Sequence, residues 1–136
     1  MIYLLDTNIC IYFLNKRSEI LIQRFRTVDL KQVAVCSVVK AELFYGALKS
    51  NNPAKNLKLQ RRFLNRFKSF PFDDRAADMY AQIRARLEKS GTPIGPNDLF
   101  IAAIAIANDL TLITHNTREF SRIEDLSFED WTDTGR

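Results

Sequence analysis

The sequence predicts an α/β fold in three layers, α/β/α, with a central, mainly parallel sheet of four to five strands. Short apolar segments alternate with segments of helical length along the chain, a pattern typical of parallel strands joined by helices. Two of these segments, IYLL and LTLIT, are apolar almost throughout, as expected of strands covered by helices on both faces. No repeat, linker or low-complexity segment divides the 136 residues, so residues 1–136 are predicted to form a single domain.

The chain begins with a predicted strand followed by two predicted helices. Residues 2–5 form the short apolar run, which ends at Asp6. Either Asp6 or Thr7 can cap a helix over residues 7–15. A more polar helix is expected around residues 18–27.

The middle of the chain contains a second predicted strand and a basic helix. The β-branched segment QVAVCS, residues 32–37, predicts a buried strand. Ser37 can cap a helix that continues to about Lys49, where the sequence SNNP ends it. Residues 54–69 predict a basic amphipathic helix, and SFPF, residues 69–72, a short extended segment.

The last part of the chain returns to alternating helices and strands. Asp73 can cap a long helix that ends near Lys89 at the sequence SGTPIGP. A very apolar helix is expected over residues 97–109, directly before the strand LTLIT, residues 110–114. A small helix over 117–122 and a last short strand, LSFEDW, over 126–131 complete the prediction.

Composition is that of an ordinary globular protein, with 46% hydrophobic and 26% charged residues. The nine-residue apolar run Leu99–Ala107 is too short to span a bilayer. The N-terminus lacks a basic segment and meets an aspartate at position 6, so no signal peptide is expected. Cys10 and Cys36 lie in apolar segments and form no CxxC pair, which favours a reduced, cytoplasmic chain with two buried thiols.

Charge is distributed unevenly around a net charge of +4. Residues 55–68 contain six basic residues and no acid, whereas residues 119–133 contain six acids and one base. A basic run is commonly a solvated helix face, but it can also contact a phosphate backbone. Charge alone favours the first interpretation.

Four acidic residues occur where the predicted fold places the carboxyl ends of the strands. Asp6 ends the first strand, Glu42 lies in the helix after the second, and Asp98 opens the apolar helix. Asn116 and Glu119 follow the strand LTLIT. Because ligands of open α/β sheets gather at this edge, the four acids are candidates for one site.

Each acid also has a structural explanation. Asp6 can simply cap a helix, and Asp98 can complement the positive end of its helix while Asn97 supplies the cap. Asn116 and Glu119 have the spacing of a capping arrangement. Glu42 has no cation within one helical turn, so it needs a partner from elsewhere in the chain.

Carboxylates that do meet must take up protons or bind a cation. Two like charges 4 Å apart repel by about 4 kcal/mol at an effective dielectric constant of 20. A single histidine and two cysteines in apolar segments give little support for soft metal ligands. An all-oxygen site suits Mg²⁺ or Mn²⁺, and such an ion next to a basic surface suggests phosphodiester chemistry.

The sequence resembles the PIN-domain nucleases, specifically the VapC-type ribonuclease toxins of type II toxin–antitoxin systems. The resemblance covers nearly the whole chain in four ordered motifs: MIYLLDTNICIYFL, SVVKAELFYGA, GTPIGPNDLFIAAIA and LITHNTREFSRIEDLSFEDW. It implies that Asp6, Glu42 and Asp98 bind the metal. Asn116 stands where many members have aspartate, and Glu119 supplies an acid one helical turn later. Both are therefore candidates to complete the site, and one or two metal ions are possible.

The same resemblance implies the function. It indicates a PIN-like fold and a Mg²⁺-dependent endoribonuclease that inhibits translation by cutting structured RNA, often transfer RNA. It also implies a cytoplasmic homodimer that is neutralised by a cognate VapB-type antitoxin whose tail enters the active-site groove. Thr7 and Asn8 follow the opening motif and are expected to support the site by hydrogen bonds.

Several other residues are weighed as RNA contacts or catalytic groups. His115 could act as a base, but a metal ion can generate the nucleophile without one. Tyr12, Phe44 and Tyr45 could stack on bases, although aromatic residues at helical spacing are more often core. The basic candidates for RNA contact are Lys55, Lys58, Arg61, Arg62, Arg84 and Arg86, with solvation, the antitoxin and a dimer partner as competing uses of the basic surface.

Two other function classes are considered. A binding module on the same fold would hold RNA or a protein without cutting it, and the complete set of acids argues against it. A phosphoacceptor receiver domain needs paired acids after its first strand and a lysine near its last. The segments LLDTN and LITHN supply neither.

Overall fold

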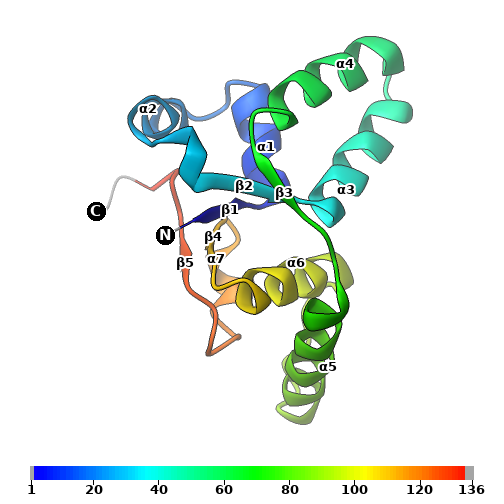
Figure 1. Cartoon of the computed structure of the whole chain (residues 1–136), viewed down its shortest axis with the longest axis vertical. Helices are drawn as coiled ribbons and strands as arrows, with labels where there is room; N and C mark the ends of the chain where they lie inside the picture. The colour runs from blue at the N-terminus through cyan, green and yellow to red at the C-terminus, as the bar shows by residue number, and fades with distance from the viewer. Residues whose placement is uncertain (1, 134–136) are drawn as a thin grey trace.

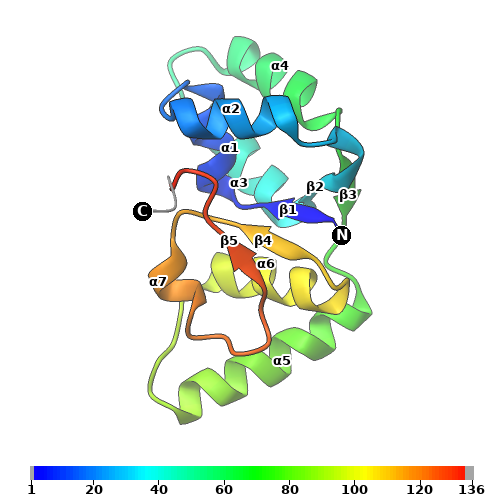
Figure 2. The same cartoon turned by 90° about the vertical axis from the view of Figure 1, so that its left-hand side faces the viewer.

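A single sheet of five parallel strands forms the centre of the computed structural model, which describes residues 2–133. The strand order is β3-β2-β1-β4-β5. The predicted three-layer fold is confirmed, because α1 to α4 lie on one side of the sheet and α5 and α6 on the other (Figures 1 and 2). The strands are β1 (Tyr3–Leu5), β2 (Val33–Cys36), β3 (Lys68–Phe70), β4 (Thr111–Ile113) and β5 (Phe128–Glu129).

The helices cover the sheet with their apolar faces, and the buried side chains form one continuous core. Their bounds are α1 (Thr7–Leu14), α2 (Glu19–Thr27), α3 (Ser37–Leu48), α4 (Pro53–Leu64), α5 (Asp74–Lys89), α6 (Pro96–Ala107) and α7 (Thr117–Phe120), with a 3₁₀ turn at Leu30–Gln32. In α6, every residue from Ile101 to Ala105 is buried, which explains why its sequence is almost entirely apolar. No helix within residues 2–133 has the length and apolar character needed to cross a membrane.

The register of the central strands sets the position of the first acid. Leu5 of β1 lies opposite Ile113 of β4, so Asp6 and Thr114 leave the sheet side by side. The backbone N–H of Asp6 donates to the carbonyl of Ile113 over 2.9 Å, which extends the ladder by one bond. The carboxyl ends of the two strands therefore present Asp6 and Thr114 at the same edge.

The basic helix is shorter than predicted. We expect it over residues 54–69, but α4 ends at Leu64 and Lys68–Phe70 form the edge strand β3. Phe67 is buried in the core, and β3 pairs with β2 so that Phe70 lies opposite Cys36. Tertiary pairing of the segment with the sheet thus overrides its helical pattern.

Other predicted boundaries and caps also need correction. The last strand has only two residues, Phe128–Glu129. Helix α6 begins after Gly95 without a side-chain cap, so Asn97 is not its cap. Ser37 does not cap α3 either: Cys36 is the N-cap residue, and the Ser37 hydroxyl accepts a hydrogen bond from Phe72 N–H.

The two cysteines are buried free thiols, as the sequence predicts. Cys10 lies in α1 and Cys36 at the end of β2. Burial raises the pKa of Cys10 above that of an ordinary thiol, and it raises the pKa of Cys36 to about 11. Both thiols are therefore protonated and behave as small apolar groups.

Candidate active site

Four acids from four separate elements meet at the carboxyl edge of the sheet. Asp6 precedes α1, Glu42 lies in α3, Asp98 in the first turn of α6 and Glu119 in α7. The charges of the other three raise the pKa of Asp98, which shows that the group is close enough to interact. Within residues 2–133 none of the four forms an ion pair with Lys, Arg or His.

Asp6 is almost completely buried, with 3% of its surface exposed. One carboxylate oxygen accepts from Thr7 N–H over 2.7 Å, and the other accepts from the Thr114 hydroxyl over 2.8 Å. Burial is the largest influence and raises the pKa of Asp6, and the charges of Glu42 and Glu119 add to it. Helix capping is thus only part of the role of Asp6, because its second oxygen is bound by Thr114, which directly follows β4.

Glu42 takes its partners from outside α3, as its sequence context requires. The Thr7 hydroxyl donates to Oε1 over 2.6 Å, and the Asn97 amide donates to Oε2 over 3.1 Å. These two bonds connect α3 to α1 and to α6. Both partners are neutral, so the negative charge of Glu42 is oriented but not cancelled.

Asp98 and Glu119 form a pair that shares a hydrogen bond between their carboxyl groups. Burial, followed by the charges of Asp6 and Glu119, raises the pKa of Asp98 from 3.8 to about 7. Partial burial opposes ionisation of Glu119, but hydrogen bonds from Gly95 N–H and the Asn116 amide hold its pKa below the usual value. The shared proton therefore resides on Asp98.

Asn116 links this pair. It is the N-cap residue of α7 but makes no side-chain cap bond, so the alternative capping explanation does not account for its side chain. Its amide nitrogen lies 2.8 Å from Glu119 Oε2 and 3.5 Å from Asp98 Oδ2. The other oxygen of Glu119 accepts from Gly95 N–H over 2.7 Å. Glu119 thereby fastens the loop before α6 to α7.

Of the two residues expected to support the site, Thr7 contacts the acids and Asn8 does not. Thr7 contacts both Asp6 and Glu42. Asn8 is exposed, and its side chain makes no hydrogen bond within the described part of the chain. Sequence reasoning missed Thr114, Asn97 and Gly95 as partners of the acids. Only their positions beside acid-bearing segments could have indicated them.

All the functional groups at this edge offer oxygen ligands, which suits a hard divalent cation. Within residues 2–133, no three Asp, Glu, His or Cys side chains converge closely enough to hold an ion by protein ligands alone. Mg²⁺ commonly binds through one or two carboxylates and keeps several waters. The donor set and the uncancelled charge therefore fit Mg²⁺ or Mn²⁺ and do not fit a closed Zn²⁺ shell.

The candidate RNA contacts do not form one surface. Lys55, Lys58, Arg61 and Arg62 lie on α4, whereas Arg84 and Arg86 lie on α5 across the sheet (Figure 2). The guanidinium of Arg84 pairs with Glu88 at 3.0 Å, and that of Arg86 pairs with Asp125 at 3.2 Å. All six residues are exposed, and those on α4 form no ion pair within residues 2–133.

Three aromatic residues and His115 lie in different environments. Tyr12 and Phe44 are partly buried against the core. Tyr45 is 64% exposed, so the expectation of a core position is wrong for this residue. His115 Nδ1 lies 3.0 Å from Asp130 Oδ2 and its ring packs near Tyr12, which ties the ring to the acidic C-terminal segment.

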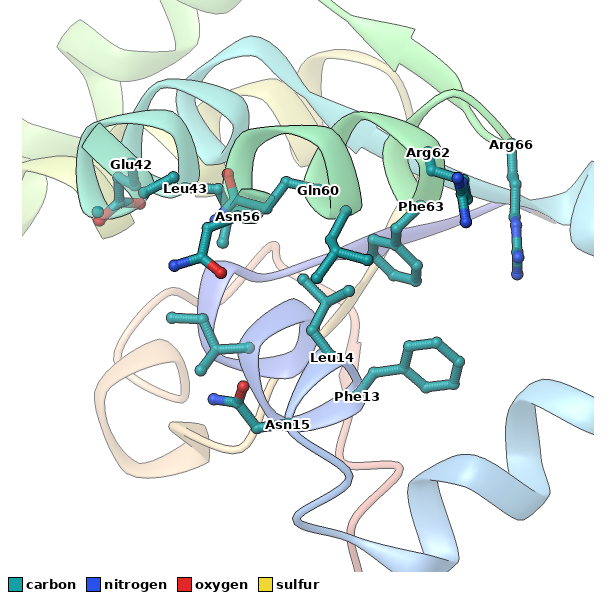
Figure 3. Close-up of a pocket in the computed structure, with 14 residues that line it drawn as sticks. Phe13, Leu14, Asn15, Glu42, Leu43, Asn56, Gln60, Arg62, Phe63 and Arg66 are labelled. Atoms are coloured by element: carbon teal, nitrogen blue, oxygen red, sulfur yellow. The ribbon is translucent and has the colours of Figure 1, made fainter. Parts of the chain in front are cut away.

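A groove of about 440 Å³ extends from Glu42 between α1, α3 and α4. Figure 3 shows Glu42 at one end and Arg62 and Arg66 at the other, with Phe13 and Phe63 on the walls. Most of the remaining lining is apolar. The side-chain oxygen of Gln60 is buried in the structure and has no hydrogen-bond partner. Such an atom is costly unless a ligand donates to it.

Comparison with known proteins agrees with this architecture. The family model of the PIN domain matches residues 3–126. Ribonuclease VapC2 of Rickettsia felis is 40% identical over 135 residues, covering 96% of this chain and 98% of the relative. The tRNA(fMet)-specific endonuclease VapC of Salmonella typhimurium is 39% identical over 129 residues, covering 95% and 97%. A chain in the crystal structure of DNA-bound VapBC from Salmonella typhimurium superimposes with a TM-score of 0.91 at 38% identity, covering 96% of this chain and 98% of that chain.

Proposed function

Because this chain belongs to the PIN-domain family, we propose that it is an endoribonuclease toxin of the VapC kind, dependent on Mg²⁺ or Mn²⁺ and neutralised by a VapB-type antitoxin. The observation that carries the proposal is the gathering of four interacting carboxylates at one sheet edge, none of which forms an ion pair within residues 2–133, although the charge of Arg122 acts on Glu119. Such an arrangement costs stability and is retained where it serves chemistry. Relatives named as ribonucleases and as a tRNA(fMet)-specific endonuclease support RNA as the substrate.

In the proposed reaction, water attacks an RNA phosphodiester in line and leaves a 5′-phosphate and a 3′-hydroxyl. Asp6, Glu42 and Asp98 would hold the cation, in part through its bound waters because no three of the acids converge on one point within residues 2–133, and Glu119 or Asn116 would complete or orient its shell. When bound, the cation activates water and neutralises charge that develops on the phosphate. The chain's own contribution is orientation: neutral donors hold the carboxylates without cancelling their charge.

The RNA substrate is tested most directly by sequencing RNA ends after brief expression of the chain. We expect new ends at a few sites in transfer RNA or another structured RNA, followed by a fall in translation. Co-expression of the antitoxin should remove these ends. RNA that is bound in a salt-dependent way but never cut would instead indicate a binding module.

Cation binding should stabilise the protein more at high pH than at low pH. The pKa of Asp98 is about 7 in the folded chain and 3.8 in the unfolded chain, so the folded chain binds this proton more tightly. This contribution to stability is complete below about pH 4 and is lost as the pH rises to about 7, so stability falls by about 1–2 kcal/mol after allowance for solvent screening. A bound cation would offset the repulsion between ionised Asp98 and the neighbouring carboxylates.

Melting curves at pH 5 and pH 8, with and without Mg²⁺, measure this effect. We expect Mg²⁺ to raise the melting temperature by several degrees at pH 8 and by less at pH 5. NaCl at the same ionic strength controls for screening. An equal rise with Mg²⁺ at both pH values would contradict the role given to Asp98.

We further propose that the groove beside Glu42 receives a mainly apolar segment of the antitoxin. The walls are apolar, the Gln60 oxygen lacks a donor, and Arg62 and Arg66 can pair with an acidic group of the partner. Solved relatives that are complexes of VapB and VapC support an antitoxin partner. We also expect the protein to be cytoplasmic and to form a homodimer. Sedimentation analysis of the purified chain would detect the dimer.

Leu59→Glu should weaken antitoxin binding about 10- to 100-fold, because it places a charge in the apolar wall of the groove. Leu59 is 45% exposed and lines the groove, so the change should leave the fold intact. Leu48→Glu is the matched control: Leu48 is 60% exposed on the neighbouring helix and does not line the groove. Calorimetric titration with the antitoxin compares the two. Similar affinities for both variants would exclude the groove as the binding surface.

A further inference from the structure

Glu42 and Tyr45 lie on one side of α3, and Lys49, its C-cap residue, follows them. Residues three and seven positions apart on a helix face the same direction, and Tyr45 lies about 4.5 Å beyond Glu42 along the axis at 1.5 Å per residue. An aromatic ring and an ammonium group therefore follow directly after an acid of the candidate active site. Neither Tyr45 nor Lys49 lines the groove proposed for the antitoxin.

The Tyr45 ring is presented to solvent. It is 64% exposed, the most exposed of the large hydrophobic residues within the described part of the chain. The Lys49 ammonium lies 5.0 Å from the ring centroid, within the range of a cation–π contact. The pair is thus an exposed aromatic ring with a positive charge over one of its faces.

Gly46 follows Tyr45 and leaves the helix backbone without a side chain next to this ring. A glycine inside a helix is less stable than alanine. A Cβ at Gly46 would meet nothing within 4 Å, so packing within residues 2–133 does not require the glycine. Gly46 lines the groove beside Glu42, and its missing side chain leaves the groove open next to Tyr45.

We infer that Tyr45 and Lys49 form a nucleotide-binding subsite that positions RNA next to the scissile phosphate. An unpaired base stacks on the Tyr45 ring, and Lys49 attracts the adjoining phosphate. Single-stranded RNA is bound in this way because every base has an aromatic face and every nucleotide carries a negative charge. A flat ring next to a cation, outside the apolar groove, favours RNA over a protein segment. The inference rests on the proposed ribonuclease function.

Kinetics of RNA cleavage test the subsite, with an RNA that the wild-type chain cuts as the probe. We expect Tyr45→Ala to raise KM about 10-fold while kcat changes less than about 2-fold, which matches the loss of one base stack. Tyr45→Trp should keep the wild-type KM because it retains a ring. Lys49→Gln should raise KM several-fold and reduce the salt dependence of RNA binding by about one counterion.

Leu30→Ala is the control, since Leu30 is also an exposed large hydrophobic residue but lies in the 3₁₀ turn Leu30–Gln32, outside α3. It should leave KM unchanged, and melting curves should show that all variants fold. An unchanged KM for Tyr45→Ala overturns the subsite, as does a Tyr45→Trp variant no better than Tyr45→Ala. Weakened antitoxin binding with normal RNA kinetics would assign the surface to the protein partner instead. A wild-type chain that cuts no RNA would contradict the proposed function itself.

Discussion

Asp98→Asn should abolish RNA cleavage and at the same time stabilise the protein. The substitution keeps the shape of the side chain but removes the charge that would bind the cation. Loss of a group that stabilises charge in the transition state typically lowers the rate by about 1,000-fold. Stability should rise because burial and the neighbouring charges raise the pKa of Asp98 to about 7, so its ionised form is unfavourable in the folded protein.

The two effects of Asp98→Asn are separable by measurement. Single-turnover cleavage gives the rate, and urea denaturation at pH 8 without divalent ions gives the free energy of unfolding, which we expect to increase by about 1 kcal/mol. Asp109→Asn is the matched control. Asp109 is exposed at the far end of α6 with φ of 54°, a conformation that asparagine tolerates. Residual activity near the wild-type level in Asp98→Asn would remove this residue from the site.

Phe120→Ala should be the most destabilising change, lowering the free energy of unfolding by about 3–5 kcal/mol. Phe120 is fully buried and is the largest of the side chains buried to this extent. It fixes α7 on the core directly after Glu119, so its packing also determines where that acid lies. Truncation leaves a cavity that the surrounding strands and helices cannot fill.

Urea denaturation of Phe120→Ala and Phe120→Leu measures this packing. Leucine fills most of the volume, and its cost should stay below about 1.5 kcal/mol. If alanine costs no more than leucine, α7 is not anchored as described and the position of Glu119 loses its physical basis.

The positions of Asp6 and Asp98 were predictable because each adjoins an apolar segment with a clear pattern. Asp6 ends a run of buried residues, and Asp98 starts one. In an α/β sheet such junctions lie at one edge, so sequence order alone brings the acids together. The sheet layers and the need of Glu42 for a distant partner followed from the same patterns.

The neutral donors were not predictable. Thr114 and Asn97 hold Asp6 and Glu42 through single hydrogen bonds, and a lone threonine or asparagine has no periodicity that distinguishes it. The end of α4 was missed for a related reason. Phe67 continues the helical pattern locally, and only pairing of β3 with β2 ends the helix before it.

The proposed function requires these four carboxylates to form one cation site that is used to cut RNA. Cleavage of RNA by the purified chain tests it most directly when Mg²⁺ is removed with EDTA and then restored, for the wild type and for Asp6→Asn in parallel. The site described here predicts that wild-type cleavage stops in EDTA and returns with Mg²⁺, and that Asp6→Asn is inactive throughout. Cleavage that persists in EDTA, or that is undiminished in Asp6→Asn, would contradict it.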